Sequence, residues 1–259
     1  MRVTITMKAI SLTFSILLLS GCVSTGVTKT SKVDPAKAMD TRIELGMKYL
    51  DAGNRDQALR QFLDVLEVDK KNPRGLQGLA LVHQLNGEPE AAEENFQKSI
   101  KYANKKEISA SRYTYGLFLS RQGRYEDASV QFEEVAKDLS YPERAYSLYF
   151  AGRCALELNN IVRAKAAFTH ALNLRSSMAP AVIELADLAF KDQDYSTAKR
   201  YLDRYNKLTE PSARSLWLGI RIERIFDNQD RVSSQALALK NMFGYSKEYL
   251  EYKALIESQ

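Results

Sequence analysis

The sequence is poor in the residues that most often carry out chemistry. Its 259 residues include two cysteines and two histidines, with no H-E-x-x-H, C-x-x-C, P-loop or G-x-S-x-G pattern. The two cysteines could pair on number alone, but Cys22 lies where N-terminal processing would use it, so a disulfide framework is not expected. These absences argue against a metal site, a bound cofactor or a catalytic nucleophile. They predict a protein that is not an enzyme.

Clusters of charge of one sign are also missing. The chain has 37 Lys and Arg residues against 32 Asp and Glu residues, a formal net charge of +5, and the signs alternate along the sequence. Nucleic-acid binding usually depends on basic residues gathered in a block or a stripe. We therefore expect a solvated charged surface and no nucleic-acid partner.

The chain has no hydrophobic run long enough to span a membrane. Residues 9–19 form an apolar stretch of eleven residues, whereas a spanning helix needs roughly 20. Arg2 and Lys8 give this stretch the basic flank of a secretory signal. The stretch ends in Leu19-Ser20-Gly21-Cys22, which matches the bacterial lipobox: an aliphatic residue and two small residues before a cysteine.

Resemblance to the lipobox implies that residues 1–21 are a signal peptide and that the Cys22 thiol carries diacylglycerol. Acylation of the new amino terminus, with palmitate, would then give stable anchoring, which a single chain does not. Val23 stands where inner-membrane lipoproteins usually carry Asp, which favours the periplasmic leaflet of the outer membrane. Residues 22–38 lack apolar periodicity and predict a lipidated, flexible tether. The alternative is an ordinary cleaved signal followed by an incidental cysteine.

A motif recurs along the rest of the chain with a period of about 34 residues. Each copy has a small residue, then an alanine, then a large apolar residue four positions after that alanine. The small residues are Gly46, Ala80, Gly116, Gly152, Ala186 and Gly219; the alanines are Ala58, Ala92, Ala128, Ala164 and Ala198; the apolar residues are Phe62, Phe96, Phe132, Phe168 and Leu202. The sixth copy is weaker, with Ser233 where alanine is expected. The pattern resembles the tetratricopeptide repeat, a helix-turn-helix unit.

This repeat predicts an all-α fold without strands, a superhelical solenoid over residues 39–259 with about six helix-turn-helix units. Small residues on the first helix and alanine on the second let the two backbones approach, and the phenylalanine fills the gap to the next unit. Residues 248–258, "EYLEYKALIES", form an amphipathic helix suited to capping the exposed end of the stack. Cys154, on a first helix, is interpreted as a small buried hydrophobe.

Proteins of this repeat family bind ligands mainly along their first helices, at the second, fifth, ninth and twelfth positions of each unit. The candidate partner-binding groove here is Ile43, Met47, Leu50, Leu81, Tyr113, Leu117, Tyr146 and Tyr149. The ninth positions continue with Arg153 and Asp187, but the groove as a whole is apolar and rich in tyrosine. Such a groove favours an amphipathic or extended peptide segment. The alternative for each residue is a place in the core between repeats.

Longer stretches resemble the type IV pilus biogenesis and stability lipoproteins, the PilF and PilW pilotin family. They include "YPERAYSLYFAGRCALELNN", "APAVIELADLAFKDQDYSTAKRYLDRY" and "SARSLWLGIRIERIFDNQD", within a likeness from about Thr41 to Tyr249. The resemblance implies a monomeric outer-membrane lipoprotein with six tetratricopeptide repeats. It also implies binding of pilus secretin (PilQ-like) subunits, support of their localisation and multimerisation, and hence a part in twitching motility.

The sequence departs from that family at several places near the groove. The family usually has Asn near Tyr149 and near Thr114, and Cys where Ser120 stands. Polar contacts of the family therefore do not transfer to these positions. The alternative function is a tetratricopeptide-repeat lipoprotein scaffold for another envelope machine, such as cell-wall synthesis or protein secretion.

Overall fold

The computed structural model describes residues 34–257, and every regular element in that range is an α-helix. The helices are α1 (Pro35–Asp51), α2 (Arg55–Val68), α3 (Pro73–Asn86), α4 (Pro89–Tyr102), α5 (Ile108–Arg121), α6 (Tyr125–Ala136), α7 (Arg144–Glu157), α8 (Ile161–Leu174), α9 (Ala179–Lys191), α10 (Tyr195–Asn206), α11 (Ala213–Ile225), α12 (Gln229–Phe243) and α13 (Lys247–Glu257). None of these helices is both long and apolar enough to cross a membrane. The predicted signal peptide and Cys22 lie outside the described residues.

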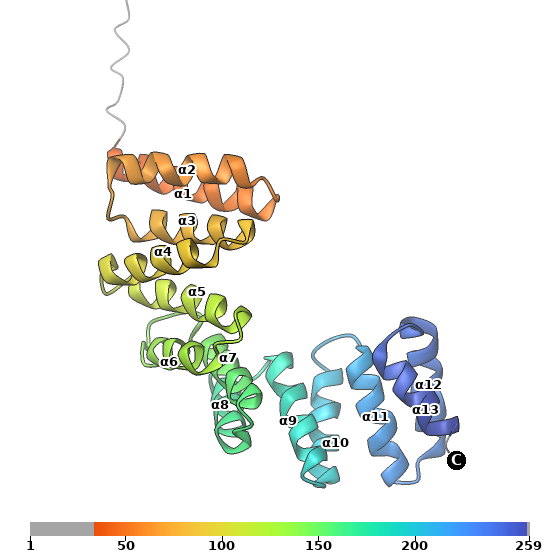
Figure 1. Ribbon diagram of the computed structural model, residues 1–259. Coiled ribbons are helices and arrows are strands. Elements are labelled where there is room, and N and C mark those ends of the chain that lie inside the picture. The colour runs from red at the N-terminus through yellow and green to blue at the C-terminus, as the bar shows by residue number, and fades with distance from the viewer. Residues whose placement is uncertain (1–33, 258–259) are drawn as a thin grey trace, which may run out of the picture.

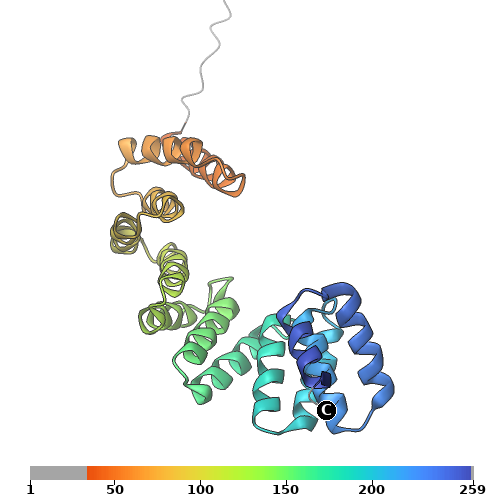
Figure 2. The same ribbon diagram turned by 45° about the vertical axis from the view of Figure 1, so that its right-hand side comes forward.

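The helices are arranged as a solenoid of antiparallel pairs, each odd-numbered helix packing against the even-numbered helix that follows it (Figure 1). The path of the stack bends near α7 and α8, which leaves two arms that are seen from a second direction in Figure 2. We call α1–α6 the N-terminal arm and α7–α13 the C-terminal arm. The prediction of an all-α tetratricopeptide-repeat solenoid is confirmed for the described part of the chain.

The first helix begins at Pro35, slightly before the expected start of the solenoid at residue 39. The side chain of Asp34 accepts a hydrogen bond from the Ala36 amide at 3.0 Å, and proline occupies the first turn. An acidic N-cap followed by proline is a strong helix start, because the cap satisfies a free amide and proline has no amide to leave unsatisfied. The end of the predicted tether, from Pro35 to Ala38, is therefore helical.

The recurring phenylalanines are fully buried against the small residues of the first helices. Phe62, Phe132 and Phe168 are each 0% exposed. A Cβ added to Gly152 would lie 2.6 Å from the Phe168 ring, and one added to Gly46 would lie 2.6 Å from Phe62. Glycine on the first helix therefore makes the space that the ring fills, which is the physical cause of the repeat's spacing.

The sixth pair and the last helix are packed differently. Ser233 is exposed, so the alignment of Ser233 with the buried alanines is wrong; Ala236 and Leu239 are the buried residues of α12. The side chain opposite Gly219 is Gln235. Helix α13 packs on α11 and α12, where the Trp217 and Tyr252 rings meet edge to face at 6.3 Å. This helix is the predicted cap, because it covers apolar surface that a seventh repeat would otherwise bury.

Candidate functional site: the first-helix face

Helices α1, α3, α5, α7, α9 and α11 are the first helices of the six pairs, and we call the surface that they present the first-helix face. A cleft of about 370 Å³ lies between α5 and α7. A second, of about 340 Å³, lies between α7 and α9, and a third, of about 250 Å³, lies where α9, α11 and α13 meet. The first two clefts fall within the size range of ligand-binding sites, and all three are lined by side chains of several elements.

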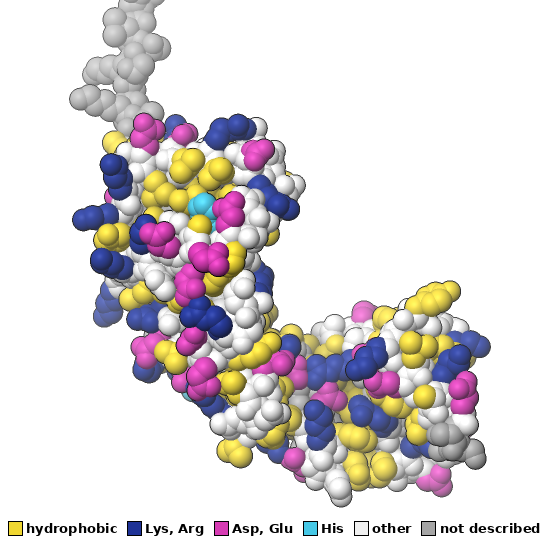
Figure 3. Space-filling model, viewed as in Figure 1, with side chains coloured by type: hydrophobic (Ala, Val, Ile, Leu, Met, Phe, Trp, Pro, Cys, Tyr) yellow, Lys and Arg dark blue, Asp and Glu magenta, His cyan; other side chains and the backbone are white. Residues whose placement is uncertain are grey.

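Most of the predicted groove residues of the N-terminal arm lie partly open on this face. Met47 is 37% exposed, and Leu50 and Leu81 are half-buried at the edges of two hydrophobic clusters. Leu117 lines the α5–α7 cleft. Figure 3 shows hydrophobic side chains gathered over the first two helix pairs. Met47, Leu50, Leu81 and Leu117 thus lie partly open on first helices, and their role in binding stays a prediction.

Tyr113 is half-buried at the centre of an aromatic cluster. Its ring lies 6.0 Å from that of Phe132 and 6.1 Å from those of Tyr141 and Phe150. Burial, reinforced by the charge of Glu143, raises the pKa of the Tyr113 hydroxyl to about 12. Burial likewise raises the pKa of Tyr141 to about 12. Tyrosine combines apolar ring area with a polar hydroxyl, which suits a binding surface.

Two of the predicted groove residues belong mainly to the core. Ile43 is 4% exposed and Tyr149 is 9% exposed. The Tyr149 ring packs between Phe150 and Phe168, and its hydroxyl accepts a hydrogen bond from Arg153 Nη1 at 3.3 Å. Tyr146 is half-buried beneath the guanidinium of Arg175, 5.2 Å from the ring centre. Ile43 and Tyr149 thus offer little surface to a partner, and what Tyr149 does expose lies in the lining of the α7–α9 cleft.

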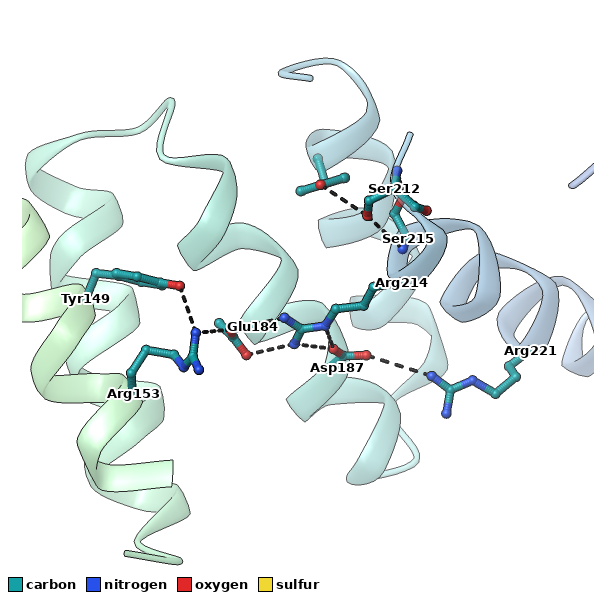
Figure 4. Close-up of polar contacts among 9 residues, drawn as sticks. Tyr149, Arg153, Glu184, Asp187, Ser212, Arg214, Ser215 and Arg221 are labelled. Atoms are coloured by element: carbon teal, nitrogen blue, oxygen red, sulfur yellow. Dashed lines mark hydrogen bonds and ion pairs between the residues drawn. The ribbon is translucent and has the colours of Figure 1, made fainter. Parts of the chain in front are cut away.

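The first-helix face of the C-terminal arm is charged, and here the description of the groove as apolar needs correction. Figure 4 shows a polar network that runs from α7 through α9 to α11. Arg214 donates to both oxygens of Glu184, at 3.1 and 2.7 Å, and to Asp187 at 2.6 Å. Arg153 approaches Glu184 at 3.7 Å from one side, and Arg221 approaches Asp187 at 3.9 Å from the other.

Burial and aromatic contacts hold this network in place. The Glu184 side chain is 6% exposed, so its carboxylate depends on Arg214 to offset the lost hydration. The guanidinium of Arg221 lies 4.7 Å from the Phe190 ring centre and 5.2 Å from that of Trp217. The signal for this network was present in the sequence, since Arg153 and Asp187 occupy the same repeat position on adjacent first helices. The contribution of Arg214 could not be read from that pattern.

The described residues offer little of the usual catalytic geometry. Burial raises the pKa of the Cys154 thiol, whose sulfur lies 3.5 Å from the Ser120 hydroxyl, so the thiol is kept in its unreactive protonated form. His83 contacts Glu88 close to solvent. No group of three potential metal ligands comes together in the described part of the chain.

Comparison with known proteins agrees with this architecture. Residues 43–107 and 115–179 match the family model described as tetratricopeptide repeat. The chain is 34% identical over 238 residues to the type IV pilus assembly protein PilF of Pseudomonas aeruginosa, a match covering 91% of this chain and 94% of that protein. The solved structure of Pseudomonas aeruginosa PilF superposes with a TM-score of 0.78 at 33% identity, covering 85% of this chain and 98% of that one.

The fold is shared more widely than the sequence. The crystal structure of PilW, described as a widely conserved type IV pilus biogenesis factor, gives a TM-score of 0.70 at 24% identity, covering 83% of this chain and 97% of that one. The class of protein is therefore a tetratricopeptide-repeat solenoid. Within that class, the chain belongs to the PilF family of type IV pilus assembly proteins.

Proposed function

We propose that this protein is a non-enzymatic adaptor of the pilotin type, held at the periplasmic leaflet of the outer membrane by lipids on Cys22. Its first-helix face would bind subunits of the type IV pilus secretin and support their localisation and multimerisation. The observation that carries this proposal is a lipobox at Cys22 on a chain that is 34% identical to a type IV pilus assembly protein over 91% of its length. The tether would leave the solenoid free to meet its partner.

The shape and chemistry of the first-helix face support a peptide-binding role. Apolar side chains such as Met47 and Leu117 are open enough to contact a partner. They lie on a rigid stack of helices, so little ordering is lost when a segment docks. Amphipathic or extended segments commonly bind such surfaces through a few apolar anchors. This supports a scaffold that captures part of an unassembled subunit.

The anchoring role is tested by the change Cys22→Ala. We expect the protein to move from the membrane fraction to the soluble periplasmic fraction, and heat-resistant secretin multimers to be lost from the outer membrane. Cys154→Ala is the matched control, because it removes the other cysteine while leaving the lipidation site intact. Normal outer-membrane multimers in the Cys22→Ala strain would contradict the proposal.

The binding role is tested by placing a charge on the apolar part of the face. Met47→Asp puts a carboxylate on the exposed surface of α1, whereas Leu63→Asp does the same on α2, where Leu63 is 47% exposed. We expect Met47→Asp to reduce co-purification of secretin severalfold and Leu63→Asp to leave it unchanged. Equal behaviour of the two variants would assign binding to another surface. Circular dichroism would verify that both variants keep their helical content.

A further inference from the structure

The cleft between α5 and α7 combines an apolar floor with a charged rim. Leu117, Phe150 and Cys154 form the floor, and Arg121, Arg153 and Glu157 stand around it. Phe150 is fixed by its stacked contact with Phe132, whose ring centre lies 5.4 Å away. The volume of about 370 Å³ leaves room for a large apolar side chain. None of these floor residues takes part in the polar network of the C-terminal arm.

Two arginines bring positive charge to the rim, and neither has an acidic partner to itself. Arg121 is exposed and makes no ion pair with the described residues. Arg153 is 46% exposed, and the carboxylate it approaches, Glu184, is already held by both terminal nitrogens of Arg214. Arg153 also donates a hydrogen bond to the hydroxyl of Tyr149. With Glu157 as the only acid on the rim, the cleft carries an excess of positive charge.

The position of Arg153 also indicates the shape of the occupant. Arg153 lines both the α5–α7 cleft and the α7–α9 cleft. The two clefts therefore share a wall, so that one extended chain could lie across both. A compact small molecule would use one cleft only. The arginine between them would meet such a chain at its midpoint, where a planar guanidinium can pair with a carboxylate through two hydrogen bonds.

We infer that the α5–α7 cleft binds an extended peptide segment in which a large apolar residue stands next to an aspartate or glutamate. The apolar residue enters the floor at Leu117 and Phe150, and the carboxylate pairs with Arg153, with Arg121 adding attraction from the rim. Complementary charge sets the register of the segment and speeds its association. This inference rests on the proposed adaptor function and names the kind of segment that the adaptor recognises.

The experiment selects peptides on the intact, detergent-solubilised protein. Random twelve-residue peptides displayed on phage are enriched on the immobilised protein, and overlapping peptides covering the periplasmic part of the cognate secretin are measured in parallel. We expect both sets to yield binders with an acidic residue beside Leu, Ile, Met or Phe, and their affinity to fall as salt is raised. Binders without an acidic residue, or an absence of binders in both sets, would overturn the inference.

Variants of the cleft complete the test. Arg153→Glu should weaken the enriched peptides roughly tenfold or more, whereas Arg60→Glu, the same charge change on an exposed residue of α2, should leave their affinity unchanged. Ser120→Leu fills the cleft without touching the charges, and should weaken binding even if Arg153→Glu disturbs the neighbouring network. Equal affinity in all three variants would also overturn the inference.

The two peptide sets separate this inference from the proposed function. If the random peptides bind through Arg153 and no secretin peptide does, the cleft is established and the proposed partner is wrong. If secretin peptides bind but ignore both Arg153→Glu and Ser120→Leu, the adaptor function stands and the assignment of this cleft is wrong.

Discussion

The N-terminal and C-terminal arms use the same repeat but present different first-helix faces. At the ninth repeat position the N-terminal arm carries Met47, Leu81 and Leu117. The next two first helices, α7 and α9, carry Arg153 and Asp187 there. The N-terminal face has apolar and aromatic side chains at its groove positions, and the C-terminal face carries a network of buried and half-buried charges. The difference begins at α7, where the stack also bends.

The comparison shows that packing and surface chemistry are set by separate positions of the repeat. The buried alanines and phenylalanines hold each pair together in both arms, so the groove positions can change without loss of the fold. Buried ion pairs add little net stability, because desolvation offsets their attraction, but breaking one leaves a charge uncompensated. The C-terminal arm should therefore be far more sensitive to loss of a single charge than the N-terminal arm.

The largest expected effect comes from removing the central carboxylate of the network. Glu184→Ala leaves Arg214 with Asp187 alone. We expect a loss of about 3 kcal/mol in the free energy of unfolding. This value is at the low end for a broken buried pair, because the Arg214 side chain is 40% exposed. Glu44→Ala is the matched control, since exposed Glu44 holds the same repeat position in α1; its cost should stay within about 0.5 kcal/mol. Urea unfolding measures both. Equal losses would show that the network does not distinguish the arms.

A smaller effect on stability is expected from adding a methyl group to a first-helix glycine that faces a side chain of the second helix. Gly152→Ala places a Cβ 2.6 Å from the buried Phe168 ring, and overpacking should exceed the gain in helix propensity, for a net loss of about 1–2 kcal/mol. In Gly219→Ala the new Cβ meets the end of Gln235, whose Oε1 has no hydrogen-bond partner among the described residues and can turn away. That variant should be as stable as the parent or slightly more so. Thermal unfolding measures the stability of both variants. A destabilised Gly219→Ala would contradict the expectation that the Gln235 side chain can turn away.

The smallest effect concerns the alkaline behaviour of the tyrosine cluster on the N-terminal arm. Tyr113 and Tyr141 have pKa values of about 12 in the folded protein, against an ordinary value of 10.0. Between pH 10 and 12 the folded state holds protons that the unfolded state has released, so stability decreases as pH rises through this window. Ultraviolet absorbance should show these two phenolates appearing late. The double variant Tyr113→Phe, Tyr141→Phe should lose that late phase, and its persistence would assign the phase to other tyrosines.

Several features of the fold and the candidate site could be predicted from the sequence. The in-phase small residues, alanines and phenylalanines predicted the helix pairs. The apolar ninth positions of the N-terminal arm predicted Met47, Leu81 and Leu117 as groove residues, and the structure leaves Met47 exposed and the other two half-buried. The start of α1 was placed too late, because the Asp34 cap and Pro35 precede the first apolar repeat position. Ser233 was misaligned, because the sixth copy lacks the phenylalanine that marks the register elsewhere.

The sequence by itself determined the repeat, the all-α class and the lipobox, because each depends on local spacing along the chain. Only the tertiary structure decided which groove positions stay open. Ile43, Tyr113 and Tyr149 hold the same repeat position, yet Ile43 and Tyr149 are buried whereas Tyr113 is half-buried. Only the tertiary structure, likewise, joined Glu184 to Arg214, 30 residues apart. Burial and ion pairing depend on how far each repeat rotates against the next, and that rotation is set by the packing of all the side chains between them.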